Sequence, residues 1–267
     1  MSAPRAADVW ASGAAYEPYV GRWSRLVARQ FLPWLQIEPE RRWLDVGCGT
    51  GILTRSILEL AAPREVVGID PSHGFLTYAR SQTTDARARF ETGNAAAVPF
   101  DGEVFDAVVS GLVLNFVPDP AQGLAEMMRV AQPGGTIAAY VWDYADQMQL
   151  MRSCWDAAAA LDPAARDLDE GRRFPICQPD ALRSLFETAG LGRVEVRAID
   201  VPTDFRDFDD YWSPFLDGQG PAPGYVASLD QTRRATLRDT IRAALPVAPD
   251  GSIHLIARAW AVRGQRE

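Results

Sequence analysis

A glycine-rich turn between a predicted strand and a predicted helix constrains this chain more than any other feature. Residues 41–46 form a short β-rich run, and Gly47, Gly49 and Gly51 follow it directly, before a helical stretch. Glycines at such a turn let the backbone bend sharply and let a ligand approach it closely. Asp70 ends a second β-rich run about twenty residues later, where a carboxylate can accept hydrogen bonds from both hydroxyls of a ribose. The pattern predicts an α/β protein that binds a nucleoside-containing ligand.

Predicted strands and helices alternate along much of the chain. The strands are predicted at residues 41–46, 65–70, 88–92, 105–110 and 136–142, and the helices at residues 51–61, from 71 onward, at 120–130 and at 179–189. Strands joined by helices run parallel through right-handed crossovers, so we expect a doubly wound sheet. The chain has 267 residues, 47% of them hydrophobic, which suits a single domain over residues 1–267.

Two segments interrupt this alternation. Residues 144–178 predict a helical insertion, and residues 202–250 predict a second one with a single amphipathic helix. We expect both to form a lid, because neither is long enough to hold a core alone. The last two strands are predicted on either side of the second insertion, at residues 193–201 and 252–262. The remaining expected parts are an N-terminal helical cap at residues 1–40 and a cofactor-binding core at residues 41–143.

Three classes of cofactor could bind at the glycine turn. A phosphate-binding loop needs a lysine after its last glycine, and none follows here. A dinucleotide-binding turn has its third glycine at position 52, where this chain carries Ile52. The remaining class is an adenosyl group without a pyrophosphate. A glycine turn with a purely structural role and an NAD(P)-linked oxidoreductase stay open as alternatives.

Charge and cysteine content narrow the partners. The net charge of −8 repels phosphate backbones, so we expect no nucleic-acid partner. Three cysteines and two histidines offer no set of metal ligands, and the sparse cysteines suit a reducing compartment. The sequence shows no signal peptide and no run of 18 apolar residues, so we expect a cytoplasmic protein without a membrane partner.

The motifs resemble, in order, those of class I S-adenosylmethionine-dependent methyltransferases. The matching segments are the signature loop at 44–51, the ribose-binding strand end at 68–72, the adenine-binding loop at 93–100, the fourth strand at 105–110 and the turn at 132–135. The opening segment at 16–24 is similar to the ubiquinone/menaquinone-biosynthesis group of small-molecule methyltransferases. The resemblance implies a Rossmann-like methyltransferase fold of seven strands, the last antiparallel, and methyl transfer from S-adenosyl-L-methionine to a small-molecule substrate.

The resemblance also implies the residues that hold the cofactor. They are Tyr16, Arg22, Asp45, Gly47, Cys48, Gly49, Gly51, Asp70, Pro71, Asn94, Ala95, Ser110 and Gly111. Asn94 stands where the family usually has an aspartate that accepts from the adenine amino group. Its side-chain carbonyl can still accept that hydrogen bond, so we expect weaker or differently tuned binding. Asn115 stands where relatives often carry histidine, which removes one candidate base.

Methyl transfer by in-line displacement asks the protein mainly to position the acceptor and to exclude water. A base is needed only if the acceptor must lose a proton, and the weak candidates are Asp143, Tyr144 and His73. The side chains expected to line the acceptor site are Trp142, Tyr144, Trp212 and Phe215. Packing of the insertions against the sheet explains these aromatic residues equally well. A protein that binds the cofactor without turnover also stays open.

Overall fold

A computed structural model describes residues 21–217 and 220–267, and the chain divides into two compact units. The sheet unit comprises Ser24–Trp142, Ile176–Ile199 and Ala259–Glu267. The helical unit comprises Asp143–Pro175 and Asp200–Arg258, together with the described residues up to Trp23. Strands β6 (Gly192–Phe205) and β7 (Ile253–Gln265) contribute residues to both units.

Seven strands form one sheet in the order β3-β2-β1-β4-β5-β7-β6. The first five strands are β1 (Arg42–Val46), β2 (Glu65–Asp70), β3 (Ala88–Thr92), β4 (Phe105–Gly111) and β5 (Ala131–Trp142). They pair in parallel with one another, and β7 pairs antiparallel with β5. This topology confirms the expected seven-stranded, mostly parallel sheet with a reversed last strand.

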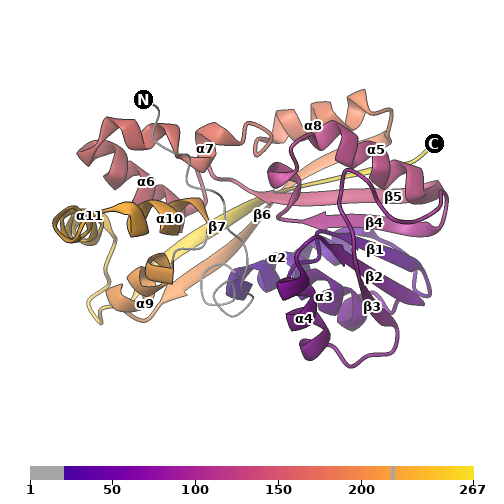
Figure 1. The fold of residues 1–267 in the computed structure, drawn as a ribbon, viewed down its shortest axis with the longest axis horizontal. Coiled ribbons are helices and arrows are strands. Elements are labelled where there is room, and N and C mark those ends of the chain that lie inside the picture. Colours follow the sequence, from indigo (N-terminus) through magenta and orange to yellow (C-terminus); the bar gives the residue numbers. More distant parts are fainter. Residues whose placement is uncertain (1–20, 218–219) are drawn as a thin grey trace. The chain divides into compact units, whose positions relative to one another are not determined.

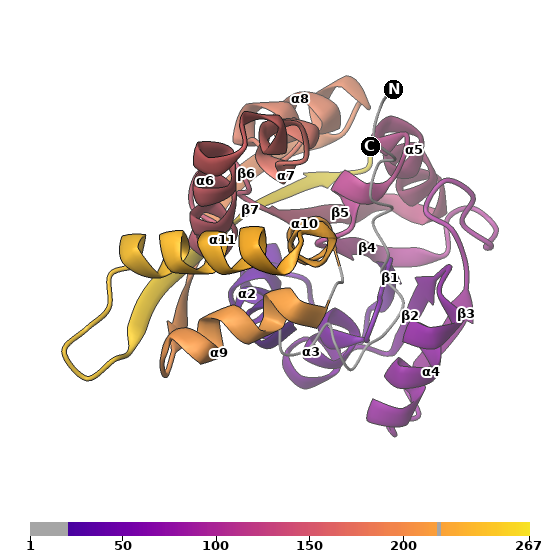
Figure 2. The ribbon, with the colours of Figure 1, turned by 60° about the vertical axis from the view of Figure 1, so that its left-hand side comes forward.

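Helices cover both faces of the sheet. The helices between its strands are α3 (Ile52–Leu60), α4 (His73–Gln82), α5 (Pro120–Val130) and α8 (Pro179–Thr188), and α2 (Arg22–Leu35) precedes β1. Figures 1 and 2 both show α3 and α4 on one face and α5 and α8 on the other. Local signals set where these helices begin, since the side chains of Ser72 and Asp119 accept from the first free backbone N–H groups of α4 and α5. The sheet is therefore doubly wound.

A row of apolar side chains crosses the central strands. Leu44 pairs in register with Val67 on β2 and with Val108 on β4, and Val108 pairs with Ile137 on β5. All four residues are completely buried. Continuous burial of this kind is characteristic of parallel strands covered on both faces. The row fixes the register, and so brings the carboxyl ends of β1, β2 and β4 to one edge of the sheet.

The helical unit gathers both insertions. Its helices are α6 (Gln149–Leu161), η3 (Pro163–Asp167), α7 (Glu170–Arg173), α9 (Phe208–Trp212), η4 (Ser213–Asp217), α10 (Pro221–Ser228) and α11 (Gln231–Ala244). Helices α10 and α11 both pack against α6 (Figure 2). No helix in the described ranges, 21–217 and 220–267, is long and apolar enough to cross a membrane.

The second insertion differs from its sequence-based description in one respect. The single amphipathic helix predicted across Val226 to Leu245 is instead the pair α10 and α11. Leu229 is extended, and the Asp230 side chain accepts from the backbone N–H of Arg233. An aspartate in this position competes with helix continuation and starts a new helix, although the apolar spacing continues across the break.

Candidate functional site

The glycine turn forms a loop at the carboxyl end of β1. Gly47, Gly49 and Gly51 all adopt positive φ, at 74°, 51° and 79°. L-residues with side chains rarely adopt this region, so the loop needs glycine for conformational reasons alone. The backbone N–H groups of Gly47 and Cys48 both donate to the carbonyl of Ile69, at 2.8 and 2.9 Å. These bonds tie the loop to the end of β2.

The three glycines differ in what surrounds them. A Cβ on Gly47 would lie 2.5 Å from a Val113 methyl group, and a Cβ on Gly51 would lie 3.2 Å from that of Ala79. Packing therefore also explains these two glycines. A Cβ on Gly49 would meet no atom of the described residues within 4 Å. Gly49 is thus the position where a ligand can approach the backbone.

Asp70 closes the site at the end of β2. One carboxylate oxygen accepts from the backbone N–H of Gly49 at 3.0 Å, and the other accepts from that of Ser72 at 2.8 Å. Each oxygen retains a further lone pair for a ligand. Burial raises the pKa of Asp70, and the two backbone hydrogen bonds oppose that rise. The structure thus brings together the glycine and the carboxylate that the sequence places twenty-one positions apart.

Asp45 lies on β1 and is almost completely buried. The Thr54 hydroxyl donates to its Oδ2 at 2.7 Å, whereas its Oδ1 is buried and has no hydrogen-bond partner within residues 21–217 and 220–267. Burial raises the pKa of Asp45 to about 7; the Thr54 hydrogen bond opposes this rise and the charge of Asp70 adds to it. A buried carboxylate oxygen without a partner is costly, so it suits a cationic or hydrogen-bond-donating ligand.

The side chain of Cys48 is buried in the hydrophobic core. Its side chain packs with Leu76, Ala79 and Phe90, and burial raises the pKa of its thiol well above the usual value. Its N–H donates to Ile69 and its carbonyl accepts from Gly51 at 2.8 Å. The protein itself therefore engages the thiol, the backbone N–H and the carbonyl of Cys48, and a cofactor contact at this residue stays a prediction.

The loop after β3 lies next to Asp70. The backbone N–H of Gly93 donates to the carbonyl of Asp70 at 3.2 Å. Asn94 is exposed, and its side-chain oxygen accepts from the N–H of Ala96 at 2.9 Å. This oxygen retains one lone pair, so it can still accept from an adenine amino group. Ala95, which lies between Asn94 and Ala96 in the chain, is half-buried.

The end of β4 forms the other side of the glycine loop. Ser110 is buried, and a Cβ on Gly111 would lie 2.6 Å from the Tyr140 hydroxyl, so packing explains this glycine. Leu112 adopts a positive φ of 62°. Asn115 is buried, and neither its Oδ1 nor its Nδ2 has a hydrogen-bond partner among the residues described. The sequence predicts for Asn115 only the loss of a base, and the apolar run 112–117 in which it lies gives no signal that its amide is unpaired.

The candidates for a base have different surroundings. Burial raises the pKa of Asp143, and the backbone N–H groups of Gln147 and Asp146 oppose that rise. Tyr144 is buried with its ring 6.0 Å from that of Phe174. His73 is exposed at the start of α4. The environment of Asp143 thus favours proton uptake more than that of an ordinary aspartate.

The remaining predicted residues lie in several places. Trp142 is buried at the end of β5. In the helical unit, Trp212 and Phe215 are buried with their rings 5.8 Å apart, and the Phe208 ring stacks on Trp212 at 6.4 Å. These ring contacts favour a packing role. Pro71 is exposed next to Asp70.

The N-terminal cofactor candidates lie at the edge of the described chain. Arg22 forms an ion pair with Asp210 at 3.2 Å, and its guanidinium lies 4.3 Å from the centre of the Trp23 ring. Its Nε and Nη2 are buried without a hydrogen-bond partner in the described structure. Tyr16 lies outside the described residues.

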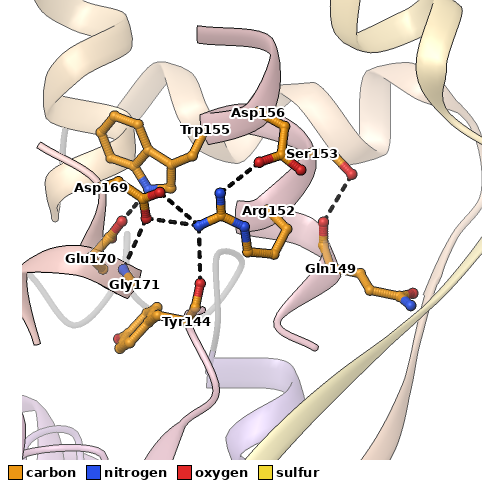
Figure 3. Close-up of polar contacts among 9 residues, drawn as sticks. All are labelled: Tyr144, Gln149, Arg152, Ser153, Trp155, Asp156, Asp169, Glu170 and Gly171. Atoms are coloured by element: carbon orange, nitrogen blue, oxygen red, sulfur yellow. Dashed lines mark hydrogen bonds and ion pairs between the residues drawn. The ribbon is translucent and has the colours of Figure 1, made fainter. Parts of the chain in front are cut away.

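A buried polar cluster in the helical unit was not anticipated from the sequence (Figure 3). Arg152 donates to both carboxylate oxygens of Asp169, at 2.7 and 2.8 Å. The Trp155 indole N–H donates to Oε2 of Glu170, whose Oε1 is buried and finds no partner in the described part of the chain. Burial raises the pKa of Glu170 to about 8. Glu170 lies in the strongly charged segment 162–173. A charged segment of this kind predicts an exposed surface, so the sequence gives no signal that Glu170 is buried.

Comparison with known proteins connects the site to a family. The chain matches the methyltransferase domain family over residues 44–139. It is 32% identical to a demethylmenaquinone methyltransferase of Roseiflexus castenholzii over 170 residues, which cover 59% of this chain and 71% of that enzyme. It is 34% identical to the enzyme of the same name from Lactiplantibacillus plantarum over 132 residues, 48% of this chain and 55% of that enzyme's own length.

A solved structure extends the similarity in fold. The crystal structure of the YcgJ protein from Bacillus subtilis superimposes with a TM-score of 0.59, covering 91% of this chain and 98% of that one, at 15% identity. At this identity the likeness concerns the fold alone. Together with the sequence matches, it establishes that the chain belongs to the class I S-adenosylmethionine-dependent methyltransferases, in the group that includes the menaquinone-biosynthesis enzymes.

Proposed function

We propose that this chain binds S-adenosyl-L-methionine at the edge formed by β1, β2 and β4 and transfers its methyl group to a small-molecule acceptor by in-line displacement. The observation that carries the proposal is the contact between Gly49 and Asp70. It joins a backbone open to close approach with a carboxylate at the end of the neighbouring strand. Membership of the methyltransferase family also supports cofactor binding at this edge.

The residues of the sheet unit fit the cofactor in chemistry. Asp70 supplies acceptors for two ribose hydroxyls, and Asn94 with the backbone of Ala95 supplies an acceptor and a donor for the adenine edge. The unpartnered oxygen of Asp45 suits the ammonium group of the methionine portion. Gly49 allows the backbone to approach the ligand. When bound, the cofactor supplies a methyl group that is already activated for displacement.

The protein's own task is then to position the acceptor and exclude water. If the acceptor must lose a proton, Asp143 is the candidate base, because burial raises its pKa toward the operating range. Trp142 and Tyr144, buried at and just after the end of β5, remain the proposed acceptor contacts. Residues 144–178 and 202–250 remain the proposed lid. The net charge of −8 argues against a nucleic-acid acceptor.

Two measurements test the proposal. Calorimetry should show binding of S-adenosylmethionine and of its demethylated product, S-adenosylhomocysteine. The protein is also incubated with methyl-labelled cofactor and, in separate samples, with demethylmenaquinol, with the charged phosphoethanolamine and with a metabolite extract. At least one sample should show transfer of label to a small molecule. Absence of cofactor binding would contradict the proposal. Binding without transfer to any acceptor would favour the alternative of a cofactor-binding protein without turnover.

The aromatic pair of the second insertion has a test of its own. We expect that replacing Trp212 and Phe215 together with alanine raises the Michaelis constant for the acceptor while cofactor affinity stays nearly unchanged. Their ring contacts support a competing account, in which the double variant loses thermal stability and keeps normal kinetics. Steady-state kinetics and thermal melting of the same preparation separate the two.

A further inference from the structure

Asn115 has an unsatisfied side chain in the sheet unit. It is 7% exposed, and both Oδ1 and Nδ2 are buried without a hydrogen-bond partner among the described residues. Leaving a buried polar group unpaired destabilises the folded protein. Such a cost in a folded protein calls for an explanation, and a ligand that pairs with the amide is a direct one.

The loop that carries Asn115 adjoins the proposed cofactor site. It follows β4, and its Val113 methyl group lies where a side chain on Gly47 would be. Leu112 in the same loop holds a positive φ of 62°. Strained backbone of this kind persists only where the surrounding structure enforces it, and it is common at ligand sites. The unpaired amide and the strained backbone therefore lie in the same loop, next to the glycine turn.

The order of the strands indicates which ligand Asn115 meets. Strand β4 pairs with β1 on the side away from β2 and β3. Asp70 ends β2 and Asn94 follows β3, so the proposed ribose and adenine contacts lie on the opposite side of β1 from Asn115. A polar group after β4 would therefore lie away from the ribose and the adenine. On that side the cofactor would present its methyl group to the acceptor.

The residues next to Asn115 in the sequence indicate the chemistry of its partner. Residues 107–118 contain no charged side chain. Three apolar residues close to Asn115 in the sequence, Leu112, Leu114 and Val117, are buried. A charged group would lose its hydration here without an opposite charge from this segment. A neutral amide offers one acceptor and two donors, which match a hydroxyl group.

We propose that Asn115 binds the methyl acceptor: its side-chain Oδ1 accepts a hydrogen bond that a hydroxyl group of an uncharged acceptor molecule donates. This inference rests on the proposed function. The amide carries no titratable proton, so Asn115 orients the hydroxyl and does not act as a base. It gives the site a preference for uncharged, hydroxyl-bearing acceptors over charged amines.

A pair of probes isolates this hydrogen bond. 1-Naphthol carries the hydroxyl group, and 1-methoxynaphthalene has the same ring system without the donor. Binding of each is measured by ligand-observed NMR titration of the full chain saturated with S-adenosylhomocysteine. The wild-type protein should bind 1-naphthol about tenfold more tightly than its methyl ether, since one buried hydrogen bond contributes about 1.4 kcal/mol.

The variant Asn115→Leu removes the amide and keeps the side chain's approximate size. It should bind both probes equally and melt at a higher temperature than the wild type, because an unpaired buried amide is gone. Thr83→Val is the matched control. It also removes a buried, unpartnered polar atom, but at the far end of α4, about 15 Å from the end that adjoins Asp70. It should keep the tenfold preference.

Each other outcome has a defined meaning. Equal binding of the two probes by the wild type, a preference that survives in Asn115→Leu, or failure of 1-naphthol to bind the product-saturated protein overturns the inference and leaves the proposed function standing. Failure of S-adenosylhomocysteine to bind contradicts the proposed function, and the inference falls with it. If Asn115→Leu does not fold, Asn115→Ala undergoes the same comparison.

Discussion

At the scale of single residues, two carboxylates dominate the candidate site, and burial acts on both. Asp70 and Asp45 have raised pKa values because they lie out of water at the ends of neighbouring strands. The two differ in their partners. Two backbone N–H groups hold Asp70, whereas one oxygen of Asp45 has no partner. Replacing each should therefore have different consequences.

Asp70→Ala should weaken cofactor binding by at least about 1.5 kcal/mol, because it removes hydrogen bonds to a charged group. It should also lower the melting temperature, since the loop loses the carboxylate that accepts from Gly49. Calorimetric titration with S-adenosylhomocysteine measures the first effect and thermal melting the second. Unchanged affinity alongside a lower melting temperature would leave Asp70 with a structural role only.

Asp45 should couple cofactor binding to proton release. With a pKa of about 7, a large fraction of its carboxyl groups is protonated at neutral pH. A cationic ammonium group bound near its free oxygen favours the ionised form, so binding at pH 7 should release protons. Calorimetry in buffers of different ionisation enthalpy measures this release. Asp45→Asn should reduce it, and an identical release in that variant would assign the proton to another group.

At the scale of elements, the glycine loop illustrates what sequence reasoning can reach. The turn, the second strand and Asp70 are local features whose chemistry permits few arrangements, so the contact between Gly49 and Asp70 was foreseeable. The break at Asp230 was not, because the apolar spacing continues through it while a single cap ends the helix. The free amide of Asn115 was also hidden, since hydrogen-bond satisfaction depends on packing that the sequence does not display.

The loop itself can be tested with two matched substitutions. Gly49→Val and Gly134→Val both place a side chain at positive φ, and in both cases the new Cβ meets no atom within 4 Å in the part of the chain that the structure describes. Backbone strain should therefore lower stability by a similar amount, about 1–2 kcal/mol. Only Gly49→Val should abolish cofactor binding, because only that glycine lies beside Asp70. Calorimetry that finds normal binding to Gly49→Val would make the loop purely structural.

At the scale of the whole molecule, the pH dependence of stability should report on the core of the helical unit. Glu170 is completely buried, and its neighbours include the Trp155 indole N–H and the charged groups Asp169 and Arg173. Burial raises its pKa from 4.5 to about 8, with the Trp155 hydrogen bond opposing the rise and Asp169 adding to it. The folded chain therefore retains a proton over a range of pH in which the unfolded chain has lost it.

The sign of the effect follows from that difference. Below pH 4.5 both states carry the proton, so the contribution of Glu170 to stability is fully present there. Between pH 4.5 and about 8 only the folded state carries it, and the free energy of unfolding should fall by up to about 1.4 kcal/mol per pH unit. Glu170→Gln cannot ionise, so its urea unfolding free energy should depend less on pH between 5 and 8. Glu59→Gln, which changes an exposed carboxylate, should keep the wild-type slope. Equal slopes in Glu170→Gln and the wild type would show that Glu170 is already ionised in the folded protein, and that water or a cation reaches its free oxygen.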